Sequence, residues 1–564
     1  MFYVGNDKGS YVTFDQGHHF VMFDNMDIGQ FYAVTADNRD PYWVYGGLQD
    51  NGNWGGPSNS RDWNGVLNDH WFKFHSGDGF HTTVDPNDWR TVYTESQGGN
   101  IRRRDAVFRQ QGKSITPRPS TIVNFQELFP DYGGGDRLSR DIFRFNWSAP
   151  LRLSPHDSHT LLFGGNYLFR SLDRGDSWKI ISPDLSTDDP ELADPESGGL
   201  TRDVTGAETH ATLITIAEST VTPGLLWAGT DDGRIHVTRN DGESWTDVSL
   251  NLPDPPRGLW VSRVEPSHFE EGTAYVSIDG HRSDEFRPWI FKTTDYGVSW
   301  TRITEGIPDG HPIYVVREDL RNPHLLFAGS EFGAFFSVDG GEEWMPLGLG
   351  LPTVAVHDLV IHPREGDLIA GTHGRSVWIL DDITALQQLT PEVMGSDLHL
   401  FKQKTATKWR GISRGATRGH KLFMGRNPLT IQQREPGNSP SELQNSAALH
   451  FWLASTPRGP ATVEISSLDG EQRATYEVEA HAGINRWFWD LRLPPSEAEV
   501  AEFQERAAEM QARGGGGFRM QGPQGMEAEA GSYLVRVTVD GRTVEGTLAV
   551  REDPGLTGVL PSVR

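Results

Sequence analysis

The stretch SLDRGDSW, from Ser171 to Trp178, decides the fold because its pattern recurs along the chain. The pattern is Ser or Thr, any residue, Asp, any residue, Gly, two further residues and Trp. A hydroxyl and a carboxylate at this spacing can hydrogen-bond the backbone of a tight turn, while Gly supplies a conformation that other residues resist. The Trp brings a large apolar ring. The stretch therefore predicts a hairpin with its Trp packed between sheets, which is a structural role.

Four more copies of this pattern follow or precede it. They are TRNDGESW (238–245), TTDYGVSW (293–300), SVDGGEEW (337–344) and a weaker TFDQGHHF (13–20). From Ser171 onward the copies begin 67, 55 and 44 residues apart, a period typical of propeller blades. The residues expected to hold these turns are Asp15, Asp173, Trp178, Asn240, Trp245, Asp295, Trp300, Asp339 and Trp344.

Eight hairpins can be read from β-branched or aromatic runs broken by Gly, Asp or Asn. They span 2–13, 42–56, 91–105, 161–171, 225–238, 273–293, 325–337 and 367–380. Apolar residues alternate or run in short blocks, which favours strands over helices. The chain therefore predicts an all-β propeller.

Two blade counts fit this pattern. In the favoured one, seven blades occupy residues 21–382 and residues 1–20 are a remnant of a preceding blade. In the other, eight blades close on the N-terminal strands. Residues 1–20 lack a candidate inner strand, which favours seven. The stretches 106–140 and 182–207 read as loops.

The rhythm changes after the propeller. Residues 383–397 read as a linker or short helix, and 398–552 alternate as strands with turns such as Asp469-Gly470. This predicts an Ig-like or fibronectin-like β-sandwich. Residues 496–530 read as a helical and Gly-rich insertion, with Ser496 and Glu499 as a capping box, and 553–564 as a tail.

Composition excludes some functions. The formal charge of −26 argues against nucleic acid, since phosphate binding needs clustered Lys and Arg. The absence of Cys excludes disulfides and thiolate metal sites. No window approaches 18 apolar residues, so no membrane span is expected. The N-terminus has no signal-peptide pattern and starts inside a repeat, which suggests either that the chain is the C-terminal part of a longer protein with a preceding propeller or that its start is misassigned.

Taken with SLDRGDSW, the stretches PYWVYGGLQDNGNW, ISPDLS, DGHRSD and GTHGRSVWILDD resemble the bacterial sortilin-like or BNR (Asp-box) repeat "glycosyl hydrolase" propellers. The resemblance covers residues 1 to about 382. The C-terminal AGIN, WDLR and GSY stretches resemble the Ig-like module that such proteins carry. The resemblance implies a periplasmic or extracellular protein with a glycan or peptide ligand, and no cofactor.

The turns between second and third strands are the candidate site, because they lie on the face opposite the Asp-box turns and should ring the channel. Carboxylates there could serve as a catalytic pair, since a glycosidase needs an acid and a base or nucleophile. The catalytic candidates are Asp50, Asp231, Asp232, Asp279 and Glu331. The ligand-binding candidates are Gln49, Asn51, Trp54, Glu95, Gln97, Asn166, His281, His373 and Arg375. Among these turns, the polar and aromatic side chains of Gly47–Trp54 are more than a turn requires.

A metal ligand set of Asp279, His281 and Asp284 is conceivable by residue type, but its spacing matches no known metal motif, so no metal is predicted. No Ser-nucleophile, P-loop, metalloprotease or Rossmann motif is present.

Three functions fit the sequence. The protein could bind and hydrolyse a polysaccharide, bind a ligand or peptide as sortilin does, or act as an assembly scaffold like the photosystem II assembly propeller. A sialidase is disfavoured, because the Arg-Ile-Pro motif is absent and Phe286-Arg287-Pro288 is a poor substitute. We expect a carbohydrate-directed propeller.

Overall fold

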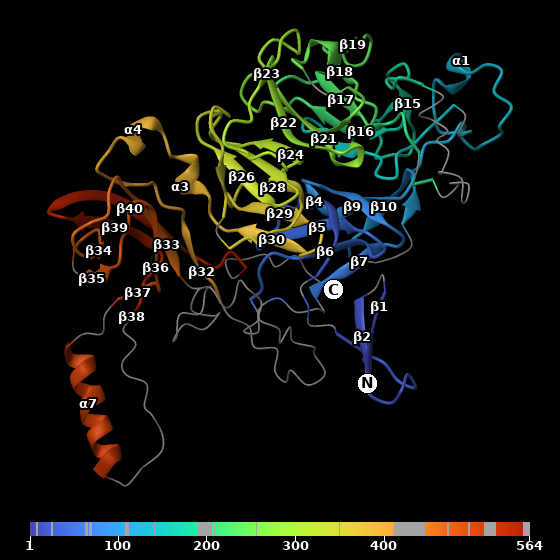
Figure 1. Ribbon diagram of the computed structural model, residues 1–564. Helices are drawn as coiled ribbons and strands as arrows, with labels where there is room; N and C mark the ends of the chain where they lie inside the picture. The colour runs from blue at the N-terminus through green and yellow to red at the C-terminus, as the bar shows by residue number, and fades with distance from the viewer. Residues whose placement is uncertain are drawn as a thin grey trace. The chain divides into compact units, whose positions relative to one another are not determined.

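The computed structural model shows an almost entirely β protein (Figure 1). It describes the chain except residues 7–8, 24–25, 27, 62–65, 67–69, 108–111, 140–141, 190–205, 208, 255–256, 349, 411–445, 471–472, 494–496, 513–525 and 556–564. The chain divides into two compact units. Of the described residues, the first unit holds those in 1–59 and 66–381, and the second holds 60–61 and those from 382 onward.

From residue 31 onward, the described part of the first unit contains seven antiparallel sheets in chain order, each with its strands paired as neighbours. Six of them have four strands. The first two are β4 (Phe31–Ala36), β5 (Trp43–Leu48), β6 (Gly52–Pro57) and β7 (Phe72–His75), then β8 (Gly79–Asp85), β9 (Asp88–Ser96), β10 (Asn100–Asp105) and β11 (Lys113–Ser114). The third and fourth are β12 (Leu151–Leu153), β13 (Leu161–Gly164), β14 (Leu168–Ser171) and β15 (Lys179–Ile180), then β16 (Leu213–Glu218), β17 (Leu226–Thr230), β18 (Ile235–Thr238) and β19 (Thr246–Asp247).

The remaining three sheets complete the series. They are β20 (Trp260–Pro266), β21 (Ala274–Gly280), β22 (Glu285–Thr293) and β23 (Thr301–Arg302), then β24 (Ile313–Glu318), β25 (Leu326–Ser330), β26 (Gly333–Ser337) and β27 (Met345–Pro346), then β28 (Val356–Ile361), β29 (Leu368–Thr372) and β30 (Val377–Leu380). Short helical segments are α1 (Phe125–Leu128), η2 (Ser249–Asn251) and η3 (His281–Ser283).

These sheets close into a ring. The first strand of each sheet contacts the first strand of the next, and β28 of the last contacts β4 of the first. An isolated bridge between Gln30 and His373 also joins the ends. The predicted seven-bladed propeller is thus confirmed, with a seventh blade that shows three strands among the described residues.

Residues 1–22 stand outside the ring. β1 (Phe2–Asn6), β2 (Gly9–Thr13) and β3 (Val21–Met22) form a separate sheet in which every residue of β1 is exposed. Thr13 and Asp15 still form the hydroxyl–carboxylate contact of the repeated turn. The alternative of eight blades is wrong, because the last blade closes the ring by contacts of β28 with β4 and not with these strands.

The repeated turn has the expected geometry. The Ser171 hydroxyl donates to Asp173 Oδ1 (2.8 Å) and accepts from the Gly175 N–H (2.7 Å), and Asp173 Oδ1 also accepts from the Ser177 N–H (2.8 Å). Gly175 has φ 86°, the region that favours glycine. The turn joins β14 to β15, so the box lies between the third and fourth strands of its blade.

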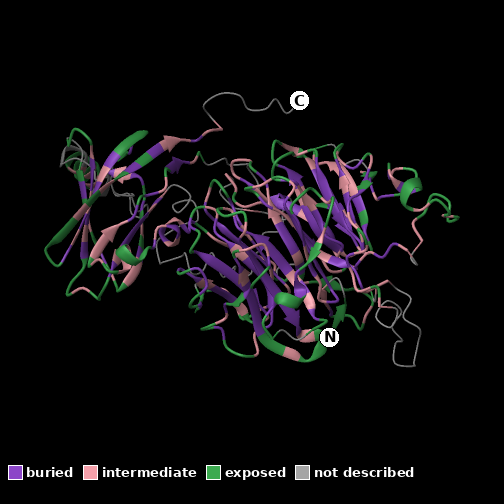
Figure 2. Ribbon diagram, turned by 90° about the horizontal axis from the view of Figure 1, so that it is seen from above, coloured by how far each residue is buried: buried purple, intermediate pink, exposed green. Residues whose placement is uncertain are grey.

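The Trp of the motif fixes one blade against the previous one. Trp178 is 1% exposed and donates its indole N–H to the Ile115 carbonyl (2.8 Å), which lies just after β11 of the preceding blade. Trp245 and Trp344 repeat this contact with the carbonyls of Ile181 and Ile303. The propeller core therefore runs along the buried strands between neighbouring blades (Figure 2).

The second unit is a β-sandwich, as predicted. Its two main sheets pack around one core that contains Leu449, Trp489, Val463 and Val535. The first sheet has β31 (Leu398–Leu400), β33 (Ala447–Leu453) and β36 (Gly483–Trp489). The second has β32 (Ala406–Lys408), β40 (Arg542–Glu552), β39 (Gly531–Val539), β34 (Ala461–Ser467) and β35 (Arg473–Val478). A two-stranded pair joins β37 (Arg492–Leu493) to β38 (Met526–Glu527).

Three helices belong to this unit. They are α3 (Thr384–Gln387), α4 (Pro391–Met394) and α7 (Glu497–Ala512). Ser496 and the Gly-rich stretch after the helix lie outside the described residues, as does most of the 553–564 tail. Arg61, from the segment between β6 and β7, belongs to this unit and pairs with Asp553 (2.7 Å).

Candidate functional site

The two ends of each blade carry different turns. Since consecutive strands run antiparallel, the turn between strands three and four lies at one end, and the turn between strands two and three lies at the other. The Asp-box turns occupy the first end. The opposite end also holds the segments that enter each inner strand, so it can bring side chains from several blades to the axis of the ring.

Irregularities in the inner strands aim side chains there. The register shifts near the start of β4, β24 and β28, where Tyr32, Tyr314 and His357 are the extra residues. A bulge of this kind leaves one residue unpaired and redirects its side chain. The three bulges therefore place two phenols and an imidazole at corresponding positions on three blades that follow one another around the ring.

These side chains meet in one group, here called the mouth cluster: Tyr32, His281, Tyr314, His357 and His373. The rings of His357 and His373 stack with centroids 4.3 Å apart and planes 4° apart. Tyr314 lies 4.3 Å from His357, and Tyr32 lies 4.9 Å from His373. His281 meets Tyr314 edge-on at 5.6 Å. Apart from the buried Tyr314, each of these residues is half-buried.

Polar groups border the mouth cluster. The Tyr32 hydroxyl donates to Gln49 Oε1 (2.9 Å), and the Tyr314 hydroxyl donates to Glu331 Oε2. Asp279 is 4% exposed and lies 2.7 Å from His281 Nδ1. These contacts leave amide and carboxylate atoms beside the rings.

An arginine completes this border. Arg282 Nη1 donates to Asp279 Oδ2 (3.1 Å), while its guanidinium carbon lies 4.0 Å from the centroid of Trp260. The side chain of Arg282 is 49% exposed, so part of the guanidinium faces solvent.

Burial keeps Tyr32, Tyr314, His357 and His373 uncharged at neutral pH. It lowers the pKa of His357 well below its ordinary value, and the neighbouring His373 lowers it further. Burial also lowers the pKa of His373 and raises that of Tyr32 to about 12. The phenol of Tyr314 has its pKa raised by burial and by its hydrogen bond to Glu331. The rings are therefore hydrogen-bonding groups with apolar faces.

Five residues expected from the sequence lie in or beside this cluster. They are Gln49, Asp279, His281, Glu331 and His373. The next turn residues have other contacts. The Asp50 N–H donates to Asp78 Oδ1 (2.8 Å), the Asn51 amide donates to the Gln49 carbonyl (3.0 Å), and the Trp54 indole donates to the Asn51 carbonyl (2.8 Å). Asn51 and Trp54 thus hold the shape of their own turn.

Two of the acidic candidates hold loops. Asp231 is fully buried and accepts from the N–H and hydroxyl of Thr212 (2.8 and 2.7 Å) and from Asn146 Nδ2 (2.9 Å). Burial raises the pKa of Asp231 to about 6. Asp232 accepts from the N–H and hydroxyl of Thr187 (2.7 and 2.8 Å). Both carboxylates are occupied by protein donors.

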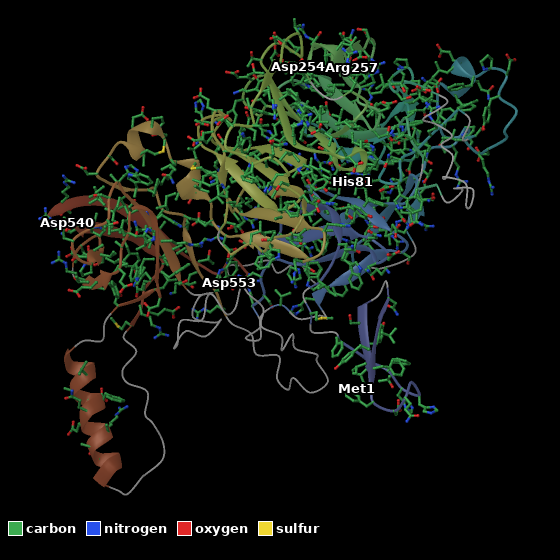
Figure 3. The ribbon with its side chains drawn as sticks, in the orientation of Figure 1. Met1, His81, Asp254, Arg257, Asp540 and Asp553 are labelled. Carbon is green, nitrogen blue, oxygen red and sulfur yellow. The ribbon has the colours of Figure 1, made fainter. Side chains whose placement is uncertain are left out.

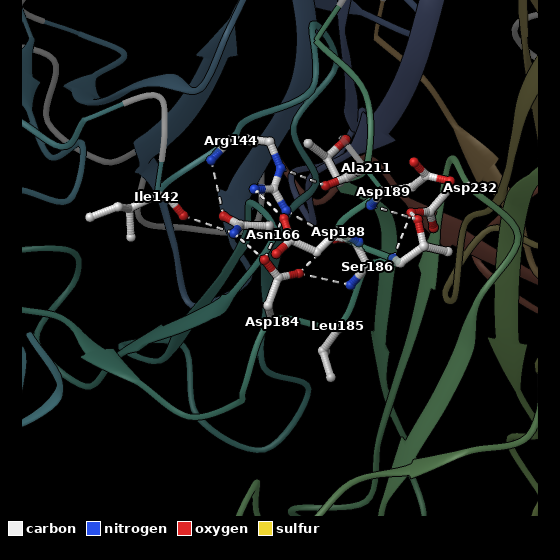
Figure 4. Close-up of polar contacts among 12 residues, drawn as sticks. Ile142, Arg144, Asn166, Asp184, Leu185, Ser186, Asp188, Asp189, Ala211 and Asp232 are labelled. Atoms are coloured by element: carbon white, nitrogen blue, oxygen red, sulfur yellow. Dashed lines mark hydrogen bonds and ion pairs between the residues drawn. The ribbon is translucent and has the colours of Figure 1, made fainter. Parts of the chain in front are cut away.

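The loop that Asp232 holds is also fixed by an arginine (Figure 4). Arg144 lies 2.8 Å from Asp184 Oδ2 and 3.0 Å from Asp188 Oδ1. Asn166, a predicted ligand-binding residue, donates to the same Asp184 oxygen (2.6 Å) and to the Ile142 carbonyl (2.9 Å). Asn166 is 1% exposed, so its polar atoms serve this loop.

The last three candidates differ from one another. Glu95 is fully buried, and neither of its carboxylate oxygens has a hydrogen-bond partner within the described part of the chain. Gln97 accepts from the Asp78 N–H (2.5 Å). Arg375 is exposed, and its carbonyl accepts from the Trp378 indole (2.9 Å).

The sequence reasoning missed Tyr32, Tyr314, His357, Arg282 and Trp260. The available signal was the second position of the inner strands, in FYAVTA (31–36), IYVVRE (313–318) and VHDLVI (356–361), where a polar ring interrupts an apolar run. A search restricted to turn residues misses this position, because no particular residue type marks the bulge that redirects the side chain.

A cavity of about 510 Å³ lies at the other end of the propeller, lined by Asp-box residues including Asp173, Arg174 and Asp176. Arg103 pairs there with Asp176 (3.1 Å), and Arg174 pairs with Asp85 (3.0 Å). We place the candidate site at the mouth cluster, since Tyr32, His357 and His373 take part in no ion pair among the described residues, and only His281 pairs with a carboxylate. Over the described residues, no three His, Asp or Glu side chains are grouped to hold a metal ion.

Comparisons with known proteins found distant structural similarities and no sequence family. No protein-family model and no curated protein matches the chain. A GH74 xyloglucanase from Xanthomonas campestris is similar in structure, with 14% identity and a TM-score of 0.46 over 93% of this chain and 79% of that chain. PorZ, a surface component of the type-IX secretion system of Porphyromonas gingivalis, has 11% identity and a TM-score of 0.42 over 96% of this chain and 62% of that chain.

The GH74 enzyme from Niastella koreensis has 12% identity and a TM-score of 0.42 over 93% of this chain and 73% of that chain. Likenesses at this level carry no functional argument, so the propeller rests on its own strand order, and the sortilin-like family remains a prediction. The described helices include none that is long and apolar enough to cross a membrane.

Proposed function

We propose that the propeller binds a glycan at the mouth cluster. The observation that carries this proposal is the group of four half-buried rings (Tyr32, His281, His357 and His373) bordered by the oxygens of Gln49, Asp279 and Glu331. Sugars present apolar C–H faces and a rim of hydroxyls. Ring faces with a few placed hydrogen-bonding groups suit both parts of such a ligand.

Neutral imidazoles support this choice of ligand. A neutral imidazole can both donate and accept a hydrogen bond, as a sugar hydroxyl can. The lowered pKa values of His357 and His373 keep both rings in this form. A glycan in a periplasmic or extracellular setting agrees with the resemblance noted in the sequence.

The test is a glycan array followed by calorimetry on wild type, Tyr32→Ala and His357→Ala. We expect each change to weaken binding by about 1–3 kcal/mol, since a stacking face is lost. Tyr296→Ala is the matched control, because this tyrosine is half-buried like the cluster rings but lies in an Asp-box turn at the other end of the propeller. Binding that survives both cluster variants would contradict the proposal, as would a peptide array that gives the only signal.

Hydrolysis is the second candidate. Asp279 and Glu331 come from neighbouring blades, and both raise the pKa of the Tyr314 phenol. The mouth cluster is therefore bordered by two carboxylates, the number that a glycosidase requires. If the glycan is cleaved, Asp279→Asn and Glu331→Gln should each lower kcat by at least about 100-fold while leaving binding measurable. The measurement is release of reducing ends. Intact glycan after incubation with wild type would leave binding as the function.

A further inference from the structure

Below the mouth cluster, the inner strands carry a group of buried charges that glycan binding does not use. It consists of Arg152 on β12, Arg263 and Glu265 on β20, Arg317 on β24 and Asp358 on β28. His81, on β8, lies inside the propeller beside this group (Figure 3). Five of the seven inner strands thus contribute a titratable side chain.

Both carboxylates are already matched. Asp358 Oδ1 lies 3.0 Å from Arg263 Nη2 and 2.8 Å from Arg317 Nη2, while its Oδ2 accepts from the Val34 N–H (3.1 Å). Glu265 lies 2.6 Å from Arg317 Nη1 and 3.4 Å from His268 Nε2. Arg317 Nε also donates to the Leu359 carbonyl, so each of the three guanidinium nitrogens has a partner.

Arg152 and Arg263 have fewer hydrogen-bond partners than Arg317. The side chain of Arg263 is 6% exposed, and its Nε is buried without a hydrogen-bond partner among the residues that the structure describes. Within the described residues, Arg152 has one hydrogen bond, between its Nη1 and His81 Nδ1 (3.3 Å). Burial, with Arg152 as the next cause, lowers the pKa of His81 well below its ordinary value, so this imidazole brings no charge.

The group therefore has three guanidiniums against two carboxylates. Burial lowers the pKa of Arg263 to about 9, and Arg317 and Arg152 act in the same direction. Arg152 is half-buried and lies on the innermost strand of its blade. A buried surplus cation is costly unless an anion compensates it.

We propose that an oxyanion binds at Arg152 and Arg263 on the axis of the propeller. Guanidinium groups recognise carboxylate, sulfate and phosphate through paired N–H donors. The oxyanion can be a free inorganic ion, or the acidic group of a glycan held at the mouth cluster. Only the second source rests on the proposed function.

The first experiment uses inorganic sulfate and phosphate without any glycan. Wild type is titrated at constant ionic strength, with chloride making up the difference, and the melting temperature is followed. We expect a saturable rise for the wild type and an affinity at least about tenfold weaker in Arg152→Gln. Arg287→Gln is the control, because this exposed arginine pairs with Glu285 on β22.

Arg152→Lys keeps the charge and guards against a folding defect in the Gln variant. We expect it to bind the oxyanion more weakly than wild type and more tightly than Arg152→Gln, since lysine cannot form the forked contact. No oxyanion-specific rise in wild type, or an equal rise in Arg152→Gln, would overturn the proposal.

The second experiment distinguishes the two sources. Neutral glycans are compared with glycans that carry carboxylate or sulfate groups. If the glycan supplies the oxyanion, wild type prefers the acidic set, sulfate competes, and Arg152→Gln loses the preference while still binding neutral glycans. If the ion is free, sulfate raises the melting temperature without displacing glycan. A failure of glycan binding alone leaves the sulfate titration unaffected, so the two proposals fail separately.

Discussion

At the scale of single residues, burial decides what a carboxyl does. Asp231 is enclosed by Thr212 and Asn146, whereas Glu95 is enclosed without partners for its oxygens among the described residues. Burial raises the pKa of Glu95 well above its ordinary value; the backbone N–H groups of Gly99, Ala149 and His81 lower it in part, although none of them meets the geometry of a hydrogen bond to the carboxylate. Two carboxyls at the ends of second strands are therefore both buried but have different hydrogen-bond surroundings.

Glu95→Gln should stabilise the protein at neutral pH by roughly 1–3 kcal/mol, because an amide removes the cost of ionising a buried carboxyl. The folded pKa is raised, so the wild type is most stable below the unfolded pKa and loses stability as the pH rises above it. Chemical unfolding from pH 4 to pH 8 should show a flatter profile for the variant. A difference between wild type and variant that does not grow with pH would contradict this account.

At the scale of elements, the Asp-box hairpin depends on oxygen acceptors more than on charge. In the turn at 238–245, Asn240 replaces Asp, and its Oδ1 still accepts from the Ser244 N–H (3.0 Å) and the Thr238 hydroxyl (2.9 Å). Its amide nitrogen then donates to Ser244 Oγ (2.9 Å), which reverses the hydroxyl contact made by Asp173 with Ser177. One geometry thus accepts either residue.

Asp173→Asn should therefore change the free energy of unfolding by less than about 0.5 kcal/mol, while Asp173→Ala should cost about 1–2 kcal/mol. The Ala variant removes the acceptor for Ser171, for the Ser177 N–H and for the Ser177 hydroxyl. Urea unfolding of both variants measures the contrast. Equal losses for Asn and Ala would show that charge, not acceptor geometry, holds the turn.

At the scale of the whole propeller, one carboxylate links non-adjacent parts of the chain. Asp358 on β28 binds Arg263 on β20 and Arg317 on β24, and accepts from Val34 on β4. Burial alone would raise its pKa, but Arg263, Arg317 and Arg152 together lower it to about 2. The ring is thus closed by packing between blades and by charges near its axis.

Asp358→Asn should destabilise the propeller by about 3–5 kcal/mol, since it leaves buried guanidiniums without their counter-charge. The folded pKa of Asp358 is lowered, so its contribution is present above the ordinary value of 3.8 and is lost as the pH falls toward 2. Thermal unfolding at pH 7 and pH 3 should show a smaller difference between wild type and Asn at the lower pH. A difference that stays constant would rule out this linkage.

The sequence by itself determined the repeated hairpin and the β-sandwich, because these follow from local patterns, whereas it left seven and eight blades open until the contact of β28 with β4 decided between them. SLDRGDSW contains the hydroxyl, carboxylate, Gly and Trp that its turn needs within eight residues. It also placed Gln49, Asp279, Glu331 and His373 on the correct end of the blades, since strand direction alternates. The tertiary structure alone decided which of them meet.

Tyr32 and His357 are separated by most of the chain, and they come within reach only because β28 closes against β4. The bulges that aim them depend on pairing with the second strand of each blade, which residue type does not specify. The charged group of Arg152, Arg263 and Asp358 has the same origin: each side chain lies on an ordinary short strand. Their proximity, and the surplus of positive charge that it creates, is a property of the closed ring.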